Sequence, residues 1–161
     1  MAPILRPLTL ADLPALYALD QRCFPPGIAY SQREIRDAVR LAPFGFHLAG
    51  LEGATLAAFI LTLRRADRGH VITLDVAPEF RRRGIGQALL LAAESHYREA
   101  GAGGMRLEAA VDNQAALAFY ARLGYRVVRT LPRYYSARLD GLLLHKDFAP
   151  AAIAPGPAAT S

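Results

Sequence analysis

Three arginines and two glycines follow an apolar, β-branched segment, and their types and spacing suit the binding of an anion. The segment at 71–76 reads VITLDV, and the residues that follow include, in order, Pro78, Arg81, Arg82, Arg83, Gly84, Ile85, Gly86 and Gln87. A strand that turns through glycine into a helix leaves backbone N–H groups unpaired at the helix start, where the helix dipole is positive. Because glycines let a ligand approach this backbone closely, the arrangement predicts a phosphate or diphosphate site.

Two common phosphate-binding patterns do not fit this turn. A P-loop requires Gly-Lys-Ser/Thr, and no lysine follows the glycines here. The dinucleotide-binding pattern requires a third glycine, but Leu89 occupies that position. The structural alternative is a tight strand-to-helix connection with solvated arginines, and the proline, arginines and glycines together favour the anion site.

Three polar residues further along are candidates for proton transfer or ligand contact. Glu108 ends an apolar segment and alternates with Leu107, so the two side chains should leave opposite faces of a strand. Its structural alternative is an exposed carboxylate paired with Arg106. Asn113 could simply cap a helix, and Tyr120 shares an apolar helical stripe and could be a core tyrosine.

The surrounding elements should place these candidates at strand ends and helix starts. Strands are expected at about 4–8, 46–52, 55–63, 71–76, 105–110, 125–131 and 141–148, with a turn at 67–69. Helices are expected at about 11–20, 31–41, 86–100 and 114–123. Strands interspersed with helices indicate an α/β or α+β domain with a mixed sheet.

Composition is consistent with a single domain and argues against several classes of protein. The chain has 161 residues, 53% of them hydrophobic, and we expect a domain at 1–148 followed by a flexible Ala/Pro-rich tail at 149–161. No apolar run reaches the roughly 20 residues of a membrane span, and no signal peptide is evident. The single Cys23 favours a reduced, cytoplasmic setting and is expected to be a small buried hydrophobe rather than a nucleophile. The net charge of +5 suits anionic ligands, but the scattered arginines argue against direct nucleic-acid binding.

The glycine turn resembles the acetyl-CoA-binding motif of the GNAT acyltransferase superfamily, Gln/Arg-x-x-Gly-x-Gly/Ala, here Arg81-x-x-Gly84-x-Gly86. The segment LEAAVDNQAALAFYARLGYRVV at 107–128 resembles the next block of the superfamily. With the later Arg133-Tyr134-Tyr135 and Asp140, it is similar to the bacterial alanine N-acetyltransferases that modify ribosomal-protein N-termini. The resemblance covers about 71–148 and implies a mixed sheet of about six to seven strands flanked by about four helices.

The resemblance also implies a role for each candidate residue, with acetyl-CoA as the donor and no metal. The backbone from Arg83 to Gln87, beside Arg81 and Arg82, would hold the diphosphate, and Asn113 would bind the cofactor arm. Backbone groups of Leu74 and Val76 would pair with the pantetheine arm and polarise the thioester carbonyl. Glu108 would act as general base, directly or through water, and Tyr120 as general acid toward the departing thiolate. The acceptor pocket would be formed by Tyr30, Arg133, Tyr134 and Tyr135, with Asp140 helping to shape it.

The acceptor is expected to be an amine, and a protein N-terminus is favoured, for example that of a ribosomal protein. An α-amine has a pKa of about 7.7–8.0 and a lysine about 10.4, so one modest base can serve the α-amine more easily. Two departures concern the acceptor: Ala109-Ala110 stand where the alanine N-acetyltransferases read Val-Arg, and Tyr30 replaces their tryptophan. The alternatives are acetylation of a small-molecule amine or amino acid, and a non-catalytic CoA-binding sensor.

Overall fold

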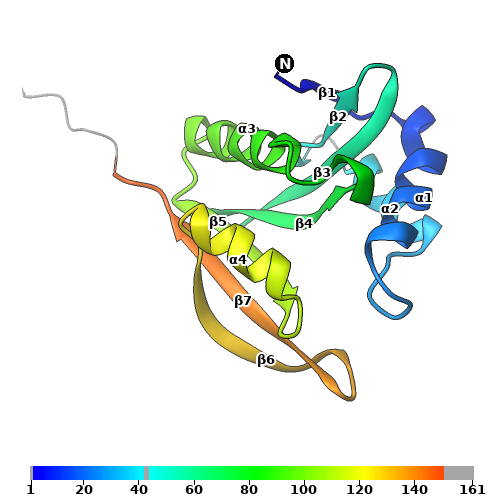
Figure 1. Cartoon of the computed structure of the whole chain (residues 1–161). Helices are drawn as coiled ribbons and strands as arrows, with labels where there is room; N and C mark the ends of the chain where they lie inside the picture. The colour runs from blue at the N-terminus through cyan, green and yellow to red at the C-terminus, as the bar shows by residue number, and fades with distance from the viewer. Residues whose placement is uncertain (1, 42–43, 151–161) are drawn as a thin grey trace, which may run out of the picture.

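One mixed β-sheet with helices on both faces forms the fold (Figure 1). The computed structural model describes residues 2–41 and 44–150. Over these residues the sheet has seven strands in the order β1-β2-β3-β4-β5-β7-β6 and is accompanied by four α-helices, which confirms the expected fold class. The strands are β1 Ile4–Pro7, β2 Leu48–Glu52, β3 Thr55–Arg65, β4 Arg68–Val76, β5 Gly104–Ala110, β6 Arg126–Ser136 and β7 Leu139–Asp147. The helices are α1 Leu13–Cys23, α2 Gln32–Arg40, α3 Ile85–Glu99 and α4 Gln114–Arg122, with short 3-10 turns at Leu10–Asp12 and Pro78–Phe80.

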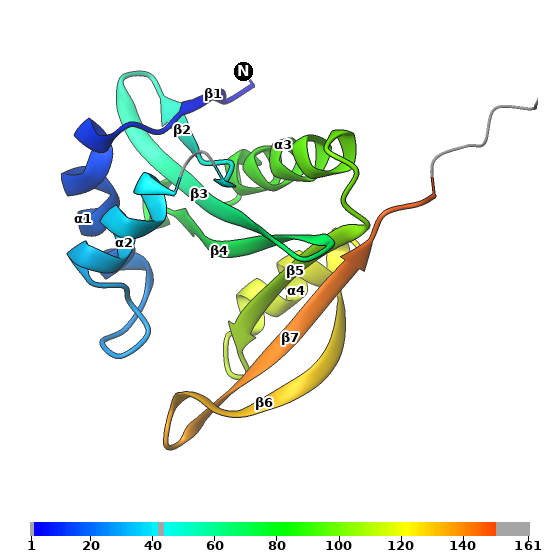
Figure 2. The same ribbon diagram turned by 180° about the vertical axis from the view of Figure 1, so that it is seen from behind.

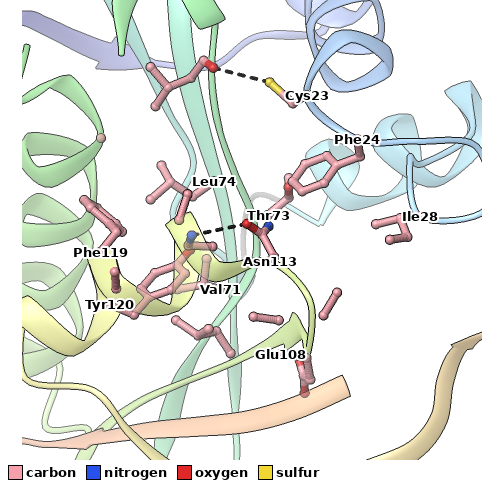
Figure 3. Close-up of a pocket in the computed structure, with 18 of the residues that line it drawn as sticks. Cys23, Phe24, Ile28, Val71, Thr73, Leu74, Glu108, Asn113, Phe119 and Tyr120 are labelled. Carbon is pink, nitrogen blue, oxygen red and sulfur yellow. Dashed lines mark hydrogen bonds between the residues drawn. The ribbon is translucent and has the colours of Figure 1, made fainter. Parts of the chain in front are cut away.

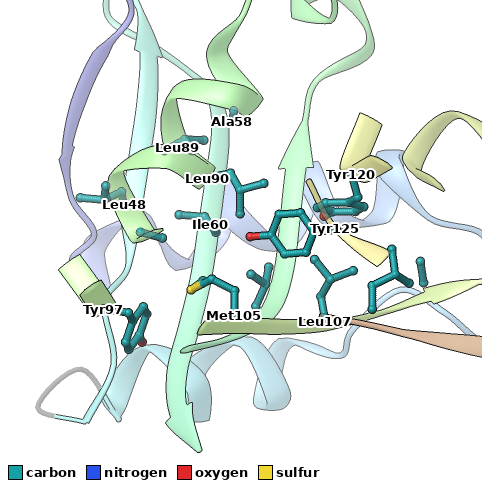
Figure 4. Packing of buried hydrophobic residues seen from close by; sticks show 14 of the residues in the cluster. Leu48, Ala58, Ile60, Leu89, Leu90, Tyr97, Met105, Leu107, Tyr120 and Tyr125 are labelled. Carbon is teal, nitrogen blue, oxygen red and sulfur yellow. The ribbon is translucent and has the colours of Figure 1, made fainter. Parts of the chain in front are cut away.

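Two apolar cores lie on opposite faces of the sheet. On one face, Leu89 and Leu90 of α3 pack against Ile60 of β3 and Leu107 of β5 (Figure 4). On the other face, α1 and α2 bury a second cluster over β3 and β4 that includes Phe59. Because burying such a side chain contributes about 1.5–3 kcal/mol, these two clusters fix which face each strand residue occupies. Among the described residues, no helix is long and apolar enough to cross a membrane.

The β4–β5 pair is parallel and separates partway along its length. Its paired residues run from Arg68 opposite Gly104 to Val71 opposite Leu107, and the pairing stops there. Beyond that point β4 still pairs with β3 as far as Val76, and β5 still pairs with β7 as far as Ala110. Each strand therefore has an unpaired edge that faces a gap between them.

Alternate residues of β4 direct their backbone N–H and C=O groups toward β3, and the residues between them direct these groups into the gap. The N–H of Ala77 donates to the carbonyl of Ala57 at 2.8 Å. Because hydrogen-bonded positions recur at every second residue of an antiparallel pair, Thr73 also faces β3. Leu74 and Val76 consequently direct their N–H and C=O groups into the gap.

Two expected boundaries were wrong, for local reasons. The turn between β3 and β4 lies at Ala66-Asp67 and not at 67–69, because Ala66 adopts φ 51° and closes the hairpin itself. Strand β6 continues to Ser136 instead of stopping at Leu131. Pro132 cannot donate to a ladder, and the β6–β7 register shifts there rather than ending. The proposed tail at 149–161 lies almost wholly outside the described residues.

Candidate functional site

A cavity of about 1050 Å³ occupies the gap between β4 and β5. This volume is at the upper end of the range of typical ligand sites, which is about 300–1,000 Å³. Residues from both faces of the sheet line the cavity, with Tyr120 and Asn113 on one side and Phe24 and Ile28 on the other (Figure 3). The cavity therefore connects the face carrying α3 and α4 with the face carrying α1 and α2.

The glycine turn forms one end of this cavity, as the sequence predicted. Gly84 precedes α3 with φ 84°, and Arg82 also adopts a left-handed conformation with φ 63°. The first backbone hydrogen bond of α3 runs from the N–H of Ala88 to the carbonyl of Gly84, at 2.9 Å. The N–H groups of the preceding helical residues therefore have no partner within α3. A Cβ on Gly86 would lie 3.2 Å from Cγ2 of Val76, so this residue must be small.

The three arginines of the motif have different environments. The Nε of Arg81 donates to the carbonyl of Val76 at 3.0 Å, so Arg81 ties the turn to the end of β4. Arg82 lines the cavity. Arg83 does not line it, and its guanidinium lies 5.3 Å from the centre of the Phe80 ring. Arg122, in the last turn of α4, also lines the cavity and was not identified from the sequence.

The exposed edge of β4 retains one fully available backbone position. The carbonyl of Val76 already accepts from Arg81 and, at 3.4 Å, from the thiol of Cys23. The hydroxyl of Tyr30 donates to the Ile72 carbonyl at 3.1 Å. Of the residues predicted to contact a ligand through the backbone, Leu74 is therefore free to offer both N–H and C=O, whereas Val76 can offer its N–H.

Asn113 and Tyr120 enter the cavity from α4. The Oδ1 of Asn113 accepts from the N–H of Ala116 at 3.2 Å, so Asn113 caps the helix and lines the cavity at the same time. Tyr120 is 8% exposed, and its ring packs edge-on against Tyr125 in the core. Burial raises the pKa of Tyr120, so its hydroxyl keeps its proton at neutral pH. Asn113 is thus a helix cap and Tyr120 a core tyrosine, as their structural alternatives stated, and both residues also line the cavity.

Glu108 forms the centre of the polar part of the site. Its Oε2 lies 2.6 Å from Nε2 of His70 on β4, and its Oε1 accepts from Arg106 at 2.9 Å. The side chain is only 9% exposed, so the alternative of an exposed carboxylate was wrong, although the pairing with Arg106 exists. Burial by itself would raise the pKa of Glu108, but the hydrogen bonds and charges of His70 and Arg106 bring it below its ordinary value of 4.5. The carboxylate is therefore ionised at neutral pH.

His70 is a second functional candidate, besides Arg122, that sequence reasoning missed. It stands 38 residues before Glu108, and no local motif links the two. The register of β4 and β5 sets His70 opposite Arg106, and this alignment brings its ring to Glu108. Its Nδ1 is buried and has no hydrogen-bond partner among the described residues.

The four residues predicted for the acceptor pocket divide into two pairs. Tyr30 and Tyr135 line the cavity. Tyr134 is 51% exposed and stands nearly perpendicular to Tyr135, with ring centres 4.9 Å apart. Arg133 has φ 55°, and its backbone N–H donates to Asp140 at 2.8 Å. Arg133 and Tyr134 consequently lie on the β6–β7 hairpin outside the lining.

Two buried carboxyl groups support the Tyr30 side of the cavity. The Oδ2 of Asp20 accepts from the backbone N–H of Tyr30 at 2.6 Å, and Asp75 accepts from the hydroxyl of Thr73 at 2.5 Å. Asp20 and Asp75 are 0% and 1% exposed. Burial raises the pKa of both groups, and their proximity raises that of Asp75 further. Asp20 therefore holds the backbone of the Tyr30 segment, and the raised pKa of Asp75 favours its protonated form.

Cys23 lines the cavity but is poorly suited to nucleophilic attack. Burial is the main reason that its pKa is raised to about 11. Its thiol therefore stays protonated near neutral pH, as expected for an unreactive cysteine, although the side chain is only partly buried. Within residues 2–41 and 44–150, no group of three His, Cys, Asp or Glu side chains is placed to hold a metal ion.

The sheet, the glycine turn and the cavity match a known family. The profile of the acetyltransferase (GNAT) family matches residues 13–125, and the chain belongs to this family. It is an N-acetyltransferase, as the following relatives also indicate.

Three relatives illustrate the similarity. An uncharacterised N-acetyltransferase of Methanocaldococcus jannaschii is 33% identical over 144 residues, which cover 89% of this chain and 90% of the relative. The ribosomal protein bS18-alanine N-acetyltransferase of Escherichia coli is 30% identical over 136 residues, covering 83% and 87%. Its crystal structure superposes with a TM-score of 0.82 over 96% of this chain and all of that one. The structure of Ard1 from Thermoplasma volcanium gives a TM-score of 0.84 at 26% identity, covering 92% and 99%.

Proposed function

We propose that this N-acetyltransferase transfers the acetyl group of acetyl-CoA to the α-amino group of a peptide or protein N-terminus. The observation that carries the proposal is the position of Glu108, an ionised carboxylate at the gap between β4 and β5. Its side chain leaves the sheet face opposite α3 and α4, beside Tyr30 and Tyr135. On this face of the sheet, α1 and α2 pack over β3 and β4, and no described helix covers β5, β7 and β6 (Figure 2).

An open sheet face beside the base favours a chain-like acceptor over a small molecule enclosed on all sides. The name of one relative agrees with this, since the Escherichia coli relative is a ribosomal protein bS18-alanine N-acetyltransferase. A ribosomal protein is therefore one candidate partner. The opposite end of the cavity, formed by the glycine turn and Asn113, is the proposed donor end.

The residues at the donor end fit acetyl-CoA. The unpaired N–H groups at the start of α3 suit its diphosphate, and the free backbone of Leu74 suits the amide groups of its pantetheine arm. When bound, acetyl-CoA supplies a thioester whose carbon–sulfur bond breaks as the acceptor nitrogen bonds to the acetyl carbon. Starting from an ammonium group, two protons must leave that nitrogen, one before the attack and one after it. One proton must reach the sulfur, and the other is released to solvent.

In this proposal Glu108 and Tyr120 carry out the proton transfers. Glu108 attracts the incoming ammonium group and accepts its first proton, directly or through water, so that a neutral amine attacks. Glu108 passes this proton to solvent and then accepts the second proton, which the nitrogen loses after the attack. His70 and Arg106 keep the carboxylate charged and fix its orientation. Tyr120, which remains protonated, donates to the departing thiolate. Because the thiol of Cys23 stays protonated, direct transfer is favoured over an acetyl-cysteine intermediate.

The proposal can be tested with a pair of peptides. One has a free N-terminal alanine and no lysine, and the other has a blocked N-terminus and one internal lysine. Mass spectrometry after incubation with acetyl-CoA should locate acetyl on the α-amine of the first and leave the second unmodified. Turnover of small amines without modification of any peptide would instead indicate a small-molecule acetyltransferase, and CoA binding without any turnover would indicate a sensor.

A further inference from the structure

An excess of arginine side chains lies on the sheet face that carries Glu108. Residues directly opposite each other on paired strands share a face, and so do residues two apart on one strand. His145 of β7 is opposite both Arg106 of β5 and Arg126 of β6, and Arg106 is two residues from Glu108. By the same pairing, the arginines of this face, hereafter the arginine face, are Arg65, Arg68, Arg106, Arg126 and Arg129.

The carboxylates on this face are too few to neutralise its arginines. Glu108 pairs with Arg106, and Asp147 pairs with both Arg68 and Arg126. Arg65 and Arg129 are exposed and have no carboxylate partner within the described part of the chain. Arg65 is also directly opposite Arg68, an arrangement of like charges that is unfavourable without a counter-charge.

His145 shows how closely the cations gather on this face. Its pKa is lowered, first by partial burial and then by the charges of Arg68, Arg106 and Arg126. The positive charges that act on His145 therefore come from β4, β5 and β6, on both sides of its own strand β7. The nearest of these arginines to Glu108 along a strand is Arg106, two residues away on β5.

The spacing of the arginine face matches an extended peptide whose amine lies at Glu108. Residues that share a face along a strand are about 7 Å apart. On β5, Arg106 is one such step from Glu108, and Gly104, which is opposite Asp147 of β7, is a second step. Residues opposite each other across the strands at one step are called a row. A peptide advances about 3.3 Å per residue, so its third residue reaches the first row and its fifth reaches the second.

We infer that the arginine face binds acidic side chains at about the third to fifth residues of the acceptor. This inference deepens the proposed function and rests on it, because it requires a peptide whose N-terminus is at Glu108. The enzyme then selects acidic N-terminal segments, and a basic segment meets repulsion on the same surface.

Acetylation of matched peptides tests this selectivity. The peptides share their first two residues and carry Asp, Asn or Lys at positions three and five. At low salt, kcat/KM should be about five- to tenfold higher for the Asp peptide than for the Asn peptide, mainly through KM, and the ratio should shrink as salt is added. The Lys peptide should be poorer than the Asn peptide.

Charge-removing variants identify the surface responsible. Arg65→Gln should reduce the Asp-to-Asn ratio, because Arg65 lies in the second row, opposite Arg68. Arg129→Gln should reduce the ratio less, because Arg129 lies on β6 in the row of Glu108 itself. The matched control Arg98→Gln, which removes an arginine stacked on Phe148 from α3 on the opposite face, should leave it unchanged.

Three outcomes would overturn the inference while leaving the proposed function intact. These are equal use of the Asp and Asn peptides, a preference for the Lys peptide, and an equal effect of the Arg98 control. Inhibition of Asn-peptide acetylation by single-stranded RNA, with no acidic preference, would assign the surface to nucleic acid and also overturn it. Absence of α-amine acetylation on every peptide would overturn the proposed function itself.

Discussion

Glu108 and His70 meet side chain to side chain across the parallel β4–β5 pair, 2.6 Å apart at the point where the two strands begin to separate. Glu108 lines the cavity, whereas His70 lies behind it and is not part of the lining. A carboxylate held here by a histidine and an arginine stays charged although it is mostly buried. This relationship determines what is expected of several variants.

Glu108→Gln should lower kcat by about a hundredfold or more, because it removes the carboxylate that takes the proton of the amine. The KM for acetyl-CoA should change little, since the glycine turn is untouched. In the wild type, the lowered pKa of Glu108 keeps the carboxylate charged above pH 5. The value of kcat/KM should therefore rise with pH as the acceptor amine deprotonates near pH 8. Steady-state kinetics from pH 5 to 9 would show this, and an unchanged kcat in the variant would contradict the role of Glu108.

His70→Gln should lower kcat by about tenfold and move the lower of the two acidic limbs of the kcat/KM profile, the one set by Glu108 below the limb of the amine, to higher pH. The reason is that loss of the histidine removes part of what holds the pKa of Glu108 down. A purely structural role would lower the melting temperature without moving this limb. The full pH profile of the variant, measured beside its thermal unfolding, separates the two roles.

Tyr120→Phe should lower kcat by about tenfold or more, because the departing thiolate loses its proton donor. Tyr125→Phe is the matched control. The two rings are neighbours in the core with centres 5.5 Å apart, but the hydroxyl of Tyr125 donates to Glu94 and is not at the cavity. The control should therefore lose stability and keep its kcat, as thermal unfolding and kinetics together would reveal. Equal kcat values for the two variants would exclude the acid role of Tyr120.

Gly84→Ala should weaken acetyl-CoA binding, measured as a higher KM or by calorimetry. Gly84 and Gly53 both have positive φ, 84° and 61°, and neither has an atom within 4 Å of where a Cβ would stand. Alanine at either position should cost about 1–2 kcal/mol of stability. Gly84 lines the cavity and Gly53 does not, so Gly53→Ala should leave the KM unchanged. An unchanged KM for Gly84→Ala would contradict the assigned donor end.

Asp75→Asn should change how stability depends on pH. The pKa of Asp75 is raised in the folded protein, so the folded state binds its proton more tightly than the unfolded chain does. Wild-type stability should therefore fall as pH rises from about 3.8, the ordinary value, through the raised pKa. The asparagine variant lacks this ionisation, so its melting temperature should gain on the wild type between pH 5 and pH 8. A constant difference over that interval would show that Asp75 does not carry the proton.

Short sequence segments were sufficient to predict those features of the site that depend on residues close together in the chain. The glycine turn, the cap at Asn113 and the position of Glu108 on the strand face opposite to Leu107 all follow from backbone preferences and from two-residue or helical periodicity. Their positions in the structure agree with those expectations, and the family follows from the same segments. The sequence alone also indicated that Tyr120 belongs to an apolar stripe, which the core packing bears out.

The tertiary structure decided which distant residues meet. Helices packed on both faces set the register of β4 against β5, and only that register brings His70 to Glu108 and stops the pairing at Val71. The arginine face arises in the same way, because its members come from four strands and none is adjacent to Glu108 in sequence. A one-residue change of register would turn each side chain to the other face. Packing over the whole sheet fixes that register, so no short segment could reveal it.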